Sequence, residues 1–232
     1  DHREGMASCY SDLGILYWSR GEFEPAEKMY QKSLAIKESQ NHREGMASDY
    51  CNLGMLYQAR GELERAEQMY QKALTIEKAL NHQEGIANNY GNLGNLYRSR
   101  GEFERAEEMY RNTLVIDEAL GRKEGMASSY GNLGILYQAQ DEFERAEEMY
   151  QKSLAIEKAL GRKAGMASDY CNLGILYQAL DELEKAEEMF QKASQLFIKL
   201  KSPKAKRISE LMDDLRSEMT GETNEKGLQG DQ

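Results

Sequence analysis

The chain has 232 residues, of which 40% are hydrophobic and 30% are charged, and it carries a formal net charge of −10 at pH 7. Nucleic-acid binding requires positive charge that displaces counterions from phosphates, whereas here the negative charge is spread evenly and no segment is basic. These features argue against a nucleic-acid partner. No apolar run reaches transmembrane length and no signal peptide is recognisable, so we expect no membrane association.

The cysteines point to a reducing compartment. Cys9, Cys51 and Cys171 form no close pair and no C-x-x-C motif, whereas a disulfide framework uses an even set at regular spacings. We therefore predict a cytoplasmic protein. The chain also begins in phase with its internal repeat, without a capping segment, so we expect it to be a fragment of a longer protein with further repeats upstream.

A forty-residue motif occurs five times in succession, without insertion or deletion, at 1–40, 41–80, 81–120, 121–160 and 161–200. A unit this short cannot bury its own apolar face and must stack on its neighbours. Stacking produces an extended array with a long surface, and the default use of such a surface is to hold another chain. The repeat therefore predicts a mode of action but no particular partner.

Each repeat predicts two helices, and the fourth repeat illustrates them. Met126, Tyr130, Leu133 and Tyr137 follow a helical spacing, and a short turn at Asp141 ends this first helix. The second helix opens with glutamates, which suit the positive end of a helix dipole. Its apolar stripe then comprises Phe143, Ala146, Met149, Tyr150 and Leu154.

Glycine and asparagine recur at fixed phases, meaning the same positions within successive forty-residue repeats. Gly125 and Gly134 lie inside the first predicted helix, where each costs roughly 1 kcal/mol relative to Ala, so a close approach between helices is the expected reason. Gly161 follows the second helix as a C-cap, and Asn41 and Asn81 are expected to serve the same role in earlier repeats.

A compound motif identifies the repeat type. Tyr-x-x-Leu-Gly-x-x-Tyr is followed by Ala-x-x-x-Tyr, and in the first repeat its members are Tyr10, Leu13, Gly14, Tyr17, Ala26 and Tyr30. The motif resembles the tetratricopeptide repeat (TPR) signature, with Tyr in place of the first Trp and of the Phe. The ordinary period is about 34 residues, and the closing Pro is absent here. The chain therefore resembles the long-repeat subclass found in Pins/LGN-type adaptors and kinesin light chains, and also bacterial arrays joined to effector domains.

We accordingly predict an all-α fold, a right-handed α-solenoid of five antiparallel helix pairs over residues 1–200. An amphipathic segment at 203–219, with Ile208 and Leu215 on its apolar face, is expected to cap the array. Residues 220–232 are rich in Gly and polar residues and lack periodicity, so we predict a disordered tail.

The resemblance implies that the first helix of each repeat lines a concave groove. One column of groove-facing positions then comprises Asn52, Asn92, Asn132 and Asn172, with Asp12 at its head. An Asn amide offers a donor and an acceptor, which match the C=O and N–H of an extended peptide, and Pins/LGN-type adaptors use Asn at this phase in that way. The alternative is that these amides bond locally, each within its own repeat.

Partner selection is expected at groove positions that vary between repeats. The third repeat differs most, with Asn88, Asn95 and Arg98, and Arg98 suits a partner carboxylate; the alternative is a solvated residue near a turn. Trp18 is a candidate hot spot, unless it packs against repeats upstream. It occupies the phase that holds Gln58, Gln138 and Gln178 elsewhere.

No catalytic, metal or cofactor site is predicted. His2, His42 and His82 share a phase but would lie roughly 10 Å or more apart, given helix spacings of 8–10 Å. The acidic residues of the second helices recur beside basic ones, which indicates a solvated, ion-paired face. We predict no enzymatic activity and no cofactor.

The sequence favours a protein-interaction scaffold that binds a peptide segment of a partner protein in its groove. Two alternatives stay open. The chain is either a regulatory or sensor array of a larger signalling or effector enzyme, or a module that self-associates through the ends of its stack.

Overall fold

The computed structural model describes residues 2–220, which form helices joined by short turns. The helices are α1 (His2–Ser19), α2 (Phe23–Ser39), α3 (Arg43–Ala59), α4 (Leu63–Ala79), α5 (Gln83–Ser99), α6 (Phe103–Leu120), α7 (Lys123–Gln138), α8 (Phe143–Leu160), α9 (Lys163–Ala179), α10 (Leu183–Lys199) and α11 (Lys204–Thr220). The predicted all-α fold is confirmed. The predicted disordered tail lies outside the described residues, except that α11 includes Thr220.

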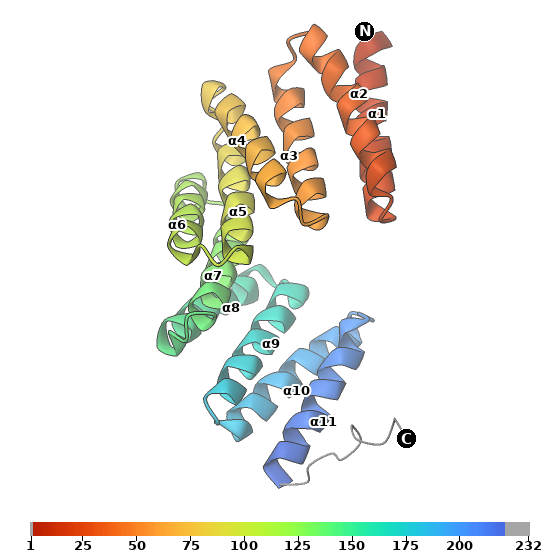
Figure 1. Cartoon of the computed structure of the whole chain (residues 1–232). Coiled ribbons are helices and arrows are strands. Elements are labelled where there is room, and N and C mark those ends of the chain that lie inside the picture. Colours follow the sequence, from red (N-terminus) through yellow and green to blue (C-terminus); the bar gives the residue numbers. More distant parts are fainter. Residues whose placement is uncertain (1, 221–232) are drawn as a thin grey trace, which may run out of the picture. The chain divides into compact units, whose positions relative to one another are not determined.

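The helices divide into two compact units. The first ends at Arg122 and contains α1–α6, and the second begins at Lys123 and contains α7–α11. Within each unit the helices pack in antiparallel pairs, one pair to each sequence repeat (Figure 1). The first unit holds α1 with α2, α3 with α4 and α5 with α6, and the second holds α7 with α8 and α9 with α10. The predicted helix pairs are therefore present.

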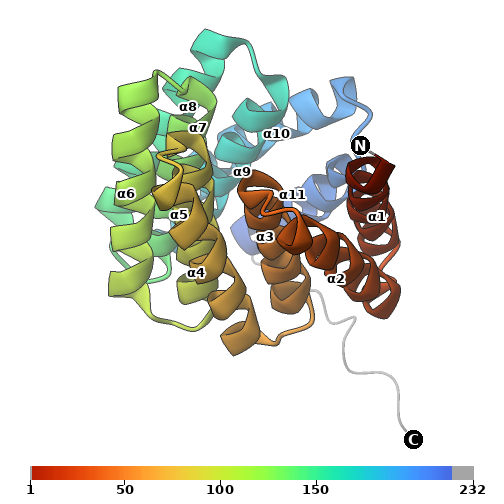
Figure 2. The same ribbon diagram turned by 90° about the horizontal axis from the view of Figure 1, so that it is seen from above.

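Successive pairs of each unit stack mainly through the second helix of one pair and the first helix of the next. In the first unit, α3 contacts both α1 and α5, while α2 and α4 each pack against the helix that follows. Viewed from above, α2, α4 and α6 lie on the outer side of α3 and α5 (Figure 2). In the second unit, α7 likewise contacts α9. The first helices of each unit therefore form one layer and the second helices another.

The core of each pair is an aromatic ring lying on a glycine. A Cβ atom added at Gly134 would lie 2.5 Å from the Tyr150 ring, and one added at Gly54 would lie 2.5 Å from the Tyr70 ring. Such distances are shorter than any tolerated contact, so no side chain fits there. The ring of the second helix is thus buried against the backbone of the first. The close approach expected at Gly134 is present, and the structure adds that an aromatic ring makes it.

Left-handed residues end the second helix of each repeat. Gly161 has φ 67° and its N–H bonds to the carbonyl of Lys158, while Asn41 and Asn81 have φ 53° and 54°. Gly and Asn are the residues that adopt this conformation at least cost. The predicted C-cap at Gly161 is confirmed. Asn41 and Asn81 instead follow the C-cap residues Gln40 and Leu80 and adopt the left-handed conformation one position later.

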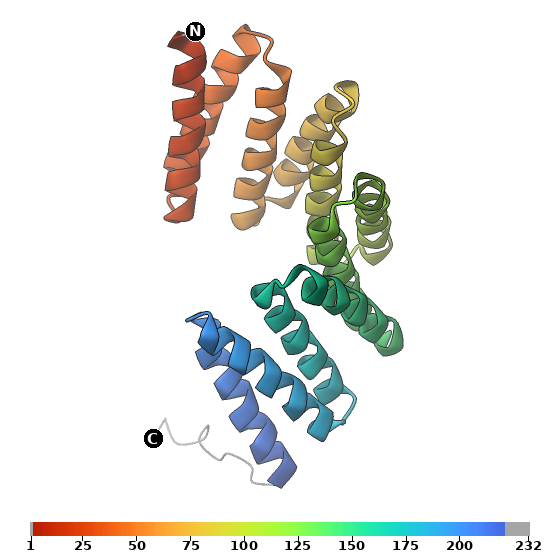
Figure 3. The same ribbon diagram turned by 180° about the vertical axis from the view of Figure 1, so that it is seen from behind.

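The last helix, α11, packs along α10 at the end of the second unit (Figure 3). Ile208 and Leu215 are buried in this contact, with 3% and 0% of their surface exposed. The charged residues Lys206, Asp213 and Asp214 are exposed. This amphipathic placement is what a cap of the second unit requires, and the capping role stays a prediction.

Candidate peptide-binding groove

A groove of about 390 Å³ runs between the two helix pairs of the second unit. Its walls come from the first helices, with Ser128 and Asn132 on α7 and Ser168 and Asn172 on α9. Asn132 and Asn172 are both half-buried. The two asparagines stand at the same phase of successive repeats, so the groove offers amide groups at the repeat spacing.

The asparagine column is placed differently in the first unit. Asn52 and Asn92 are half-buried on α3 and α5. The Nδ2 atom of Asn92 donates a hydrogen bond to Sγ of Cys51 at 3.3 Å. This bond joins Asn92 to the preceding repeat. Asn92 therefore does not show the alternative arrangement, in which the amide bonds within its own repeat. Asp12, the predicted head of the column, is exposed on α1.

The glutamines beside the column hold buried tyrosines. Tyr70 Oη donates to Oε1 of Gln58 at 2.9 Å, and Tyr150 Oη donates to Oε1 of Gln138 at 2.8 Å. Each glutamine therefore uses its acceptor oxygen within the fold. Gln178 is half-buried at the same phase on α9, where Phe190 replaces the tyrosine.

In the third repeat a different residue accepts the hydrogen bond of the buried tyrosine hydroxyl. Arg98 occupies the glutamine phase and has no acceptor atom. Tyr110 Oη donates instead to Oδ1 of Asn95 at 2.8 Å. Asn95 thus accepts the hydrogen bond that a glutamine accepts in the second and fourth repeats. Asn88 is exposed, and its Oδ1 accepts from Arg122 Nη2 at 3.3 Å.

Trp18 lies on α1 and is 37% exposed. Its neighbours Ile15 and Leu16 are 48% and 44% exposed, whereas Leu56, at the phase of Leu16 in the next repeat, is completely buried. These apolar side chains are exposed because no described helix covers that side of α1. Self-association through this face stays a prediction, and a concentration-independent mass in light scattering would count against it.

A recurring ion-pair network joins successive repeats of the first unit, and the sequence did not reveal it. Glu27 on α2 accepts from Tyr57 Oη at 2.7 Å, from Arg60 Nη1 at 2.8 Å and from Arg65 Nη2 at 3.0 Å. Burial by itself would raise the pKa of Glu27, but these hydrogen bonds and the two guanidinium charges lower it. Glu67 is held in the same way by Tyr97, Arg100 and Arg105. The signal was present as Glu, Tyr and Arg at constant phases.

The network corrects one interpretation of the acidic residues. The sequence predicts a solvated, ion-paired face for the glutamates of the second helices. The ion pairs are present, but the face is not solvated at every glutamate. The side chains of Glu27 and Glu67 are instead only 17% and 18% exposed. They are half-buried because they bridge the second helix of one repeat to both helices of the next. Glu64 and Glu104 are exposed, as expected.

Buried polar residues form the floor beneath the first helices. In the second unit, Ser153 Oγ donates to Oδ2 of the buried Asp169 at 2.8 Å, and Glu157 lies beside them. Burial and the nearby Glu157 charge raise the pKa of Asp169 to about 7, although the bond from Ser153 opposes this. Burial also raises the pKa of Glu157, against the opposing charge of Arg162. The residue types at these positions differ from repeat to repeat. That variation was the only sign in the sequence that this buried polar cluster exists.

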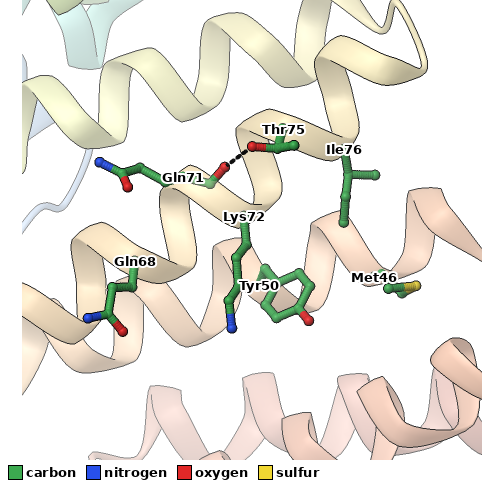
Figure 4. A pocket seen from close by; sticks show the side chains of 7 residues that line it. All are labelled: Met46, Tyr50, Gln68, Gln71, Lys72, Thr75 and Ile76. Atoms are coloured by element: carbon green, nitrogen blue, oxygen red, sulfur yellow. Dashed lines mark hydrogen bonds between the residues drawn. The ribbon is translucent and has the colours of Figure 1, made fainter.

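A second hollow lies between α3 and α4 in the first unit (Figure 4). The ammonium of Lys72 stands 5.3 Å from the centre of the Tyr50 ring, and Thr75 Oγ1 donates to the Gln71 carbonyl at 2.8 Å. The same Lys-on-Tyr contact recurs at Lys32 with Tyr10 and at Lys152 with Tyr130. Since it recurs within pairs, it is best explained by packing, and it involves none of the predicted site residues.

The sequence model of the MalT-like TPR region matches residues 13–213. The chain belongs to this family. The TPR resemblance inferred from the Tyr, Leu, Gly and Ala phases is confirmed by the match, which includes residues of all five repeats.

Solved structures similar to this MalT-like TPR region include BtubC (BKLC) from P. vanneervenii, which is 27% identical, with a TM-score of 0.76 over 86% of this chain and 82% of that one. A putative kinesin light chain from Podospora anserina with nearly identical TPR-like repeats is 21% identical, with a TM-score of 0.69 over 86% and 98% of the two chains. Comparison with curated protein sequences found no match.

The MalT-like TPR region is also similar to a signal transduction ATPase with a tetratricopeptide repeat sensor from Pyrococcus horikoshii. The two are 22% identical, with a TM-score of 0.77, and the alignment covers 91% of this chain but 31% of that one. These similarities establish the fold of the repeat array.

Within residues 2–220, the MalT-like TPR region has no group of three His, Cys, Asp or Glu side chains that would hold a metal ion. None of the helices in this described range combines the length and hydropathy that a membrane span requires. The expected lack of enzymatic activity and of cofactors stays a prediction.

Proposed function

We propose that this MalT-like TPR region is a protein-interaction module that binds an extended segment of a partner protein along its first helices. The observation that carries the proposal is the groove of the second unit, where Asn132 and Asn172 stand on neighbouring walls. An amide side chain donates and accepts at once, so two of them can hold consecutive backbone groups of a peptide without reading its sequence.

The surrounding chemistry supports a polypeptide ligand. Ser128 and Ser168 line the same groove and add hydroxyl groups, while Ile135 adds an apolar surface. Concave sites with a few placed polar groups are typical of ligand binding. In the first unit, Asn52, Gln58 and Asn95 occupy the corresponding helices, and partner selection is proposed for the third repeat through Asn88 and Arg98.

A random-peptide display selection on the purified chain, followed by affinity measurement on a selected peptide, tests the proposal. The double substitution Asn132→Ala with Asn172→Ala should weaken binding about tenfold, because each lost hydrogen bond contributes about 0.5–1.5 kcal/mol. The matched control is Gln151→Ala with Gln191→Ala, which removes two exposed amides from α8 and α10. Unchanged affinity in the asparagine variant, with helical content preserved, would contradict the clamp.

A second candidate is a sensor array within a larger signalling enzyme. The observation that favours it is the similarity to the Pyrococcus ATPase with a tetratricopeptide repeat sensor, in an alignment that covers 91% of this chain and 31% of that one. Reading the coding sequence on both sides of these residues tests this candidate. An adjoining nucleotide-binding or effector domain would support it, and an open reading frame confined to the repeats would rule it out.

A further inference from the structure

The two units contain matching buried carboxylates with different surroundings. In the first unit, Asp49 is fully buried and accepts hydrogen bonds from Ser11 Oγ at 2.7 Å and from Ser33 Oγ at 2.6 Å. Lys37 Nζ lies 2.9 Å from Asp49 Oδ2 and donates to Ser11 Oγ at 3.0 Å. The chain's own ammonium group therefore neutralises this carboxylate.

The second unit has an aspartate at the position of Asp49 but no lysine at the position of Lys37. Asp169 occupies the phase of Asp49, and Ser153, which holds it at 2.8 Å, occupies the phase of Ser33. At the phase of the lysine, however, stands a second acid, Glu157. At the phase of Ser11 stands Gly131, which has no side chain. The same backbone positions thus hold two acids in place of an acid and a base.

These two acids are short of positive charge and of hydrogen-bond donors. Asp169 and Glu157 are each only 5% exposed, and Oε2 of Glu157 is buried without a hydrogen-bond partner. Arg162 Nε is 3.5 Å from that oxygen, but Arg162 Nη1 is also 3.5 Å from the carboxylate of Glu124. The Arg162 guanidinium is therefore shared between two carboxylates, those of Glu157 and Glu124, and a buried charge without a partner is unfavourable.

The missing cation has room to enter from the groove. Asp169, Glu157 and Gly131 all line the groove that holds Asn132 and Asn172. A Cβ atom at Gly131 would meet Ser153 Oγ at 3.8 Å and Asp169 Oδ1 at 4.0 Å, which are ordinary contact distances. The space above the acids is thus open at the point where the Ser11 side chain closes it in the first unit.

We propose that this acidic floor of the second unit, formed by Asp169 and Glu157, receives a lysine side chain of the bound partner. Its ammonium group takes the position that Lys37 Nζ occupies in the first unit, against Asp169. The inference rests on the proposed peptide-binding function and adds a specificity to it. The asparagines hold the backbone, and the acidic floor selects a basic side chain beside it.

The direct test is an NMR titration with two small probes. Nα-acetyl-lysine methylamide carries the ammonium group, and Nα-acetyl-norleucine methylamide has nearly the same shape without charge. The lysine probe should shift the backbone amide signals of Gly131, Gly165 and Asp169, and the norleucine probe should not. Equal shifts from both probes, or none from either, would overturn the proposal.

Two variants keep the test independent of folding. Asp169→Asn should weaken the lysine probe by about tenfold or more, since a hydrogen bond to a charged group contributes about 1.5–3 kcal/mol. Asn89 occupies this phase in the third repeat and is buried there, so the substitution is compatible with the fold. Retained lysine-probe binding in Asp169→Asn would also overturn the proposal.

The second variant rebuilds the first unit's cluster in the second. Glu157→Lys with Gly131→Ser supplies an internal ammonium and its serine, and the variant should no longer bind the lysine probe. Gly165 leaves space for residue 157, as Gly45 does for Lys37, so the lysine fits. Full binding in this variant would contradict the assignment. If display-selected peptides bind through the asparagines without any lysine requirement, this inference fails while the proposed function stands.

Discussion

The hydroxyl of Tyr110 donates a hydrogen bond to Oδ1 of Asn95 at 2.8 Å, although the corresponding tyrosines Tyr70 and Tyr150 use a glutamine one helical turn further along. The change follows from Arg98, which occupies the glutamine phase and cannot accept a hydrogen bond. Asn95, one of the residues that distinguish the third repeat, is therefore explained in part by packing inside the fold. A partner is not needed to account for it.

Replacing Asn95 by Ile, the residue of the fourth repeat at this phase, should destabilise the chain by about 1–3 kcal/mol because the buried tyrosine hydroxyl loses its acceptor. Adding Arg98→Gln should restore most of that loss, since glutamine serves Tyr70 and Tyr150. Urea unfolding of the parent, both single variants and the double variant measures the coupling. Additive effects of the two substitutions would show that the residues do not act together.

Two glycines of α7 should respond in opposite directions to alanine. Gly134→Ala places a Cβ 2.5 Å from the Tyr150 ring, and such overpacking costs about 1–3 kcal/mol. Gly131→Ala meets its nearest atoms at 3.8 Å and 4.0 Å, so it should stabilise the helix by up to about 1 kcal/mol. Thermal unfolding distinguishes the two, and a destabilised Gly131→Ala would show that this site is tighter than its contacts indicate.

Asp169 should make stability depend on pH. Its pKa is raised to about 7 in the folded chain, whereas an unfolded Asp has a pKa of about 3.9. The folded state therefore binds the extra proton between these values, and the unfolding free energy should fall as pH rises from about 4 to about 7. Above pH 7 the effect levels off.

The Asp169→Asn variant isolates this contribution. The variant should be more stable than the parent at pH 7. Its free energy of unfolding should fall much less between pH 4 and pH 7 than that of the parent. Asp49→Asn is the matched control, because it leaves the buried Lys37 without its partner and should destabilise the chain at neutral pH. Parallel pH profiles for the parent and Asp169→Asn would contradict the assignment.

Glu67 should contribute stability with the opposite pH dependence. Burial would raise the pKa of Glu67, but hydrogen bonds from Tyr97, Arg100 and Arg105 lower it overall. A lowered pKa gives stability that is present above the unfolded value, about 4.3, and is lost as pH falls through the folded value. Glu67→Gln should lower the melting temperature at pH 7 and reduce the acid sensitivity. The exposed Glu108→Gln, beyond the first turn of α6, should change neither, and an equal effect of both would argue against the network.

Much of the candidate site was predictable because groove residues share the phase of the repeat. The column Asn52, Asn92, Asn132 and Asn172 followed from the period and the TPR resemblance. What those amides face did not follow, because their neighbours come from other repeats. Asn92 meets Cys51, forty-one positions away, at 3.3 Å, whereas Asn132 and Asn172 line an open groove.

The sequence by itself determined the helix pairs and their turns, because periodic apolar residues, glycines and left-handed caps act over a few positions of one helix or turn. It placed Gly134 at a close approach between helices and Gly161 at a helix end. Only the tertiary structure showed which groups surround each buried carboxylate. Asp49 and Asp169 stand at the same position of their repeats, and each accepts a hydrogen bond from the corresponding serine, Ser33 or Ser153. Lys37 nevertheless neutralises Asp49, while Glu157 stands beside Asp169. That difference arises where three helices converge, because electrostatic balance depends on distance in space and not on position along the chain.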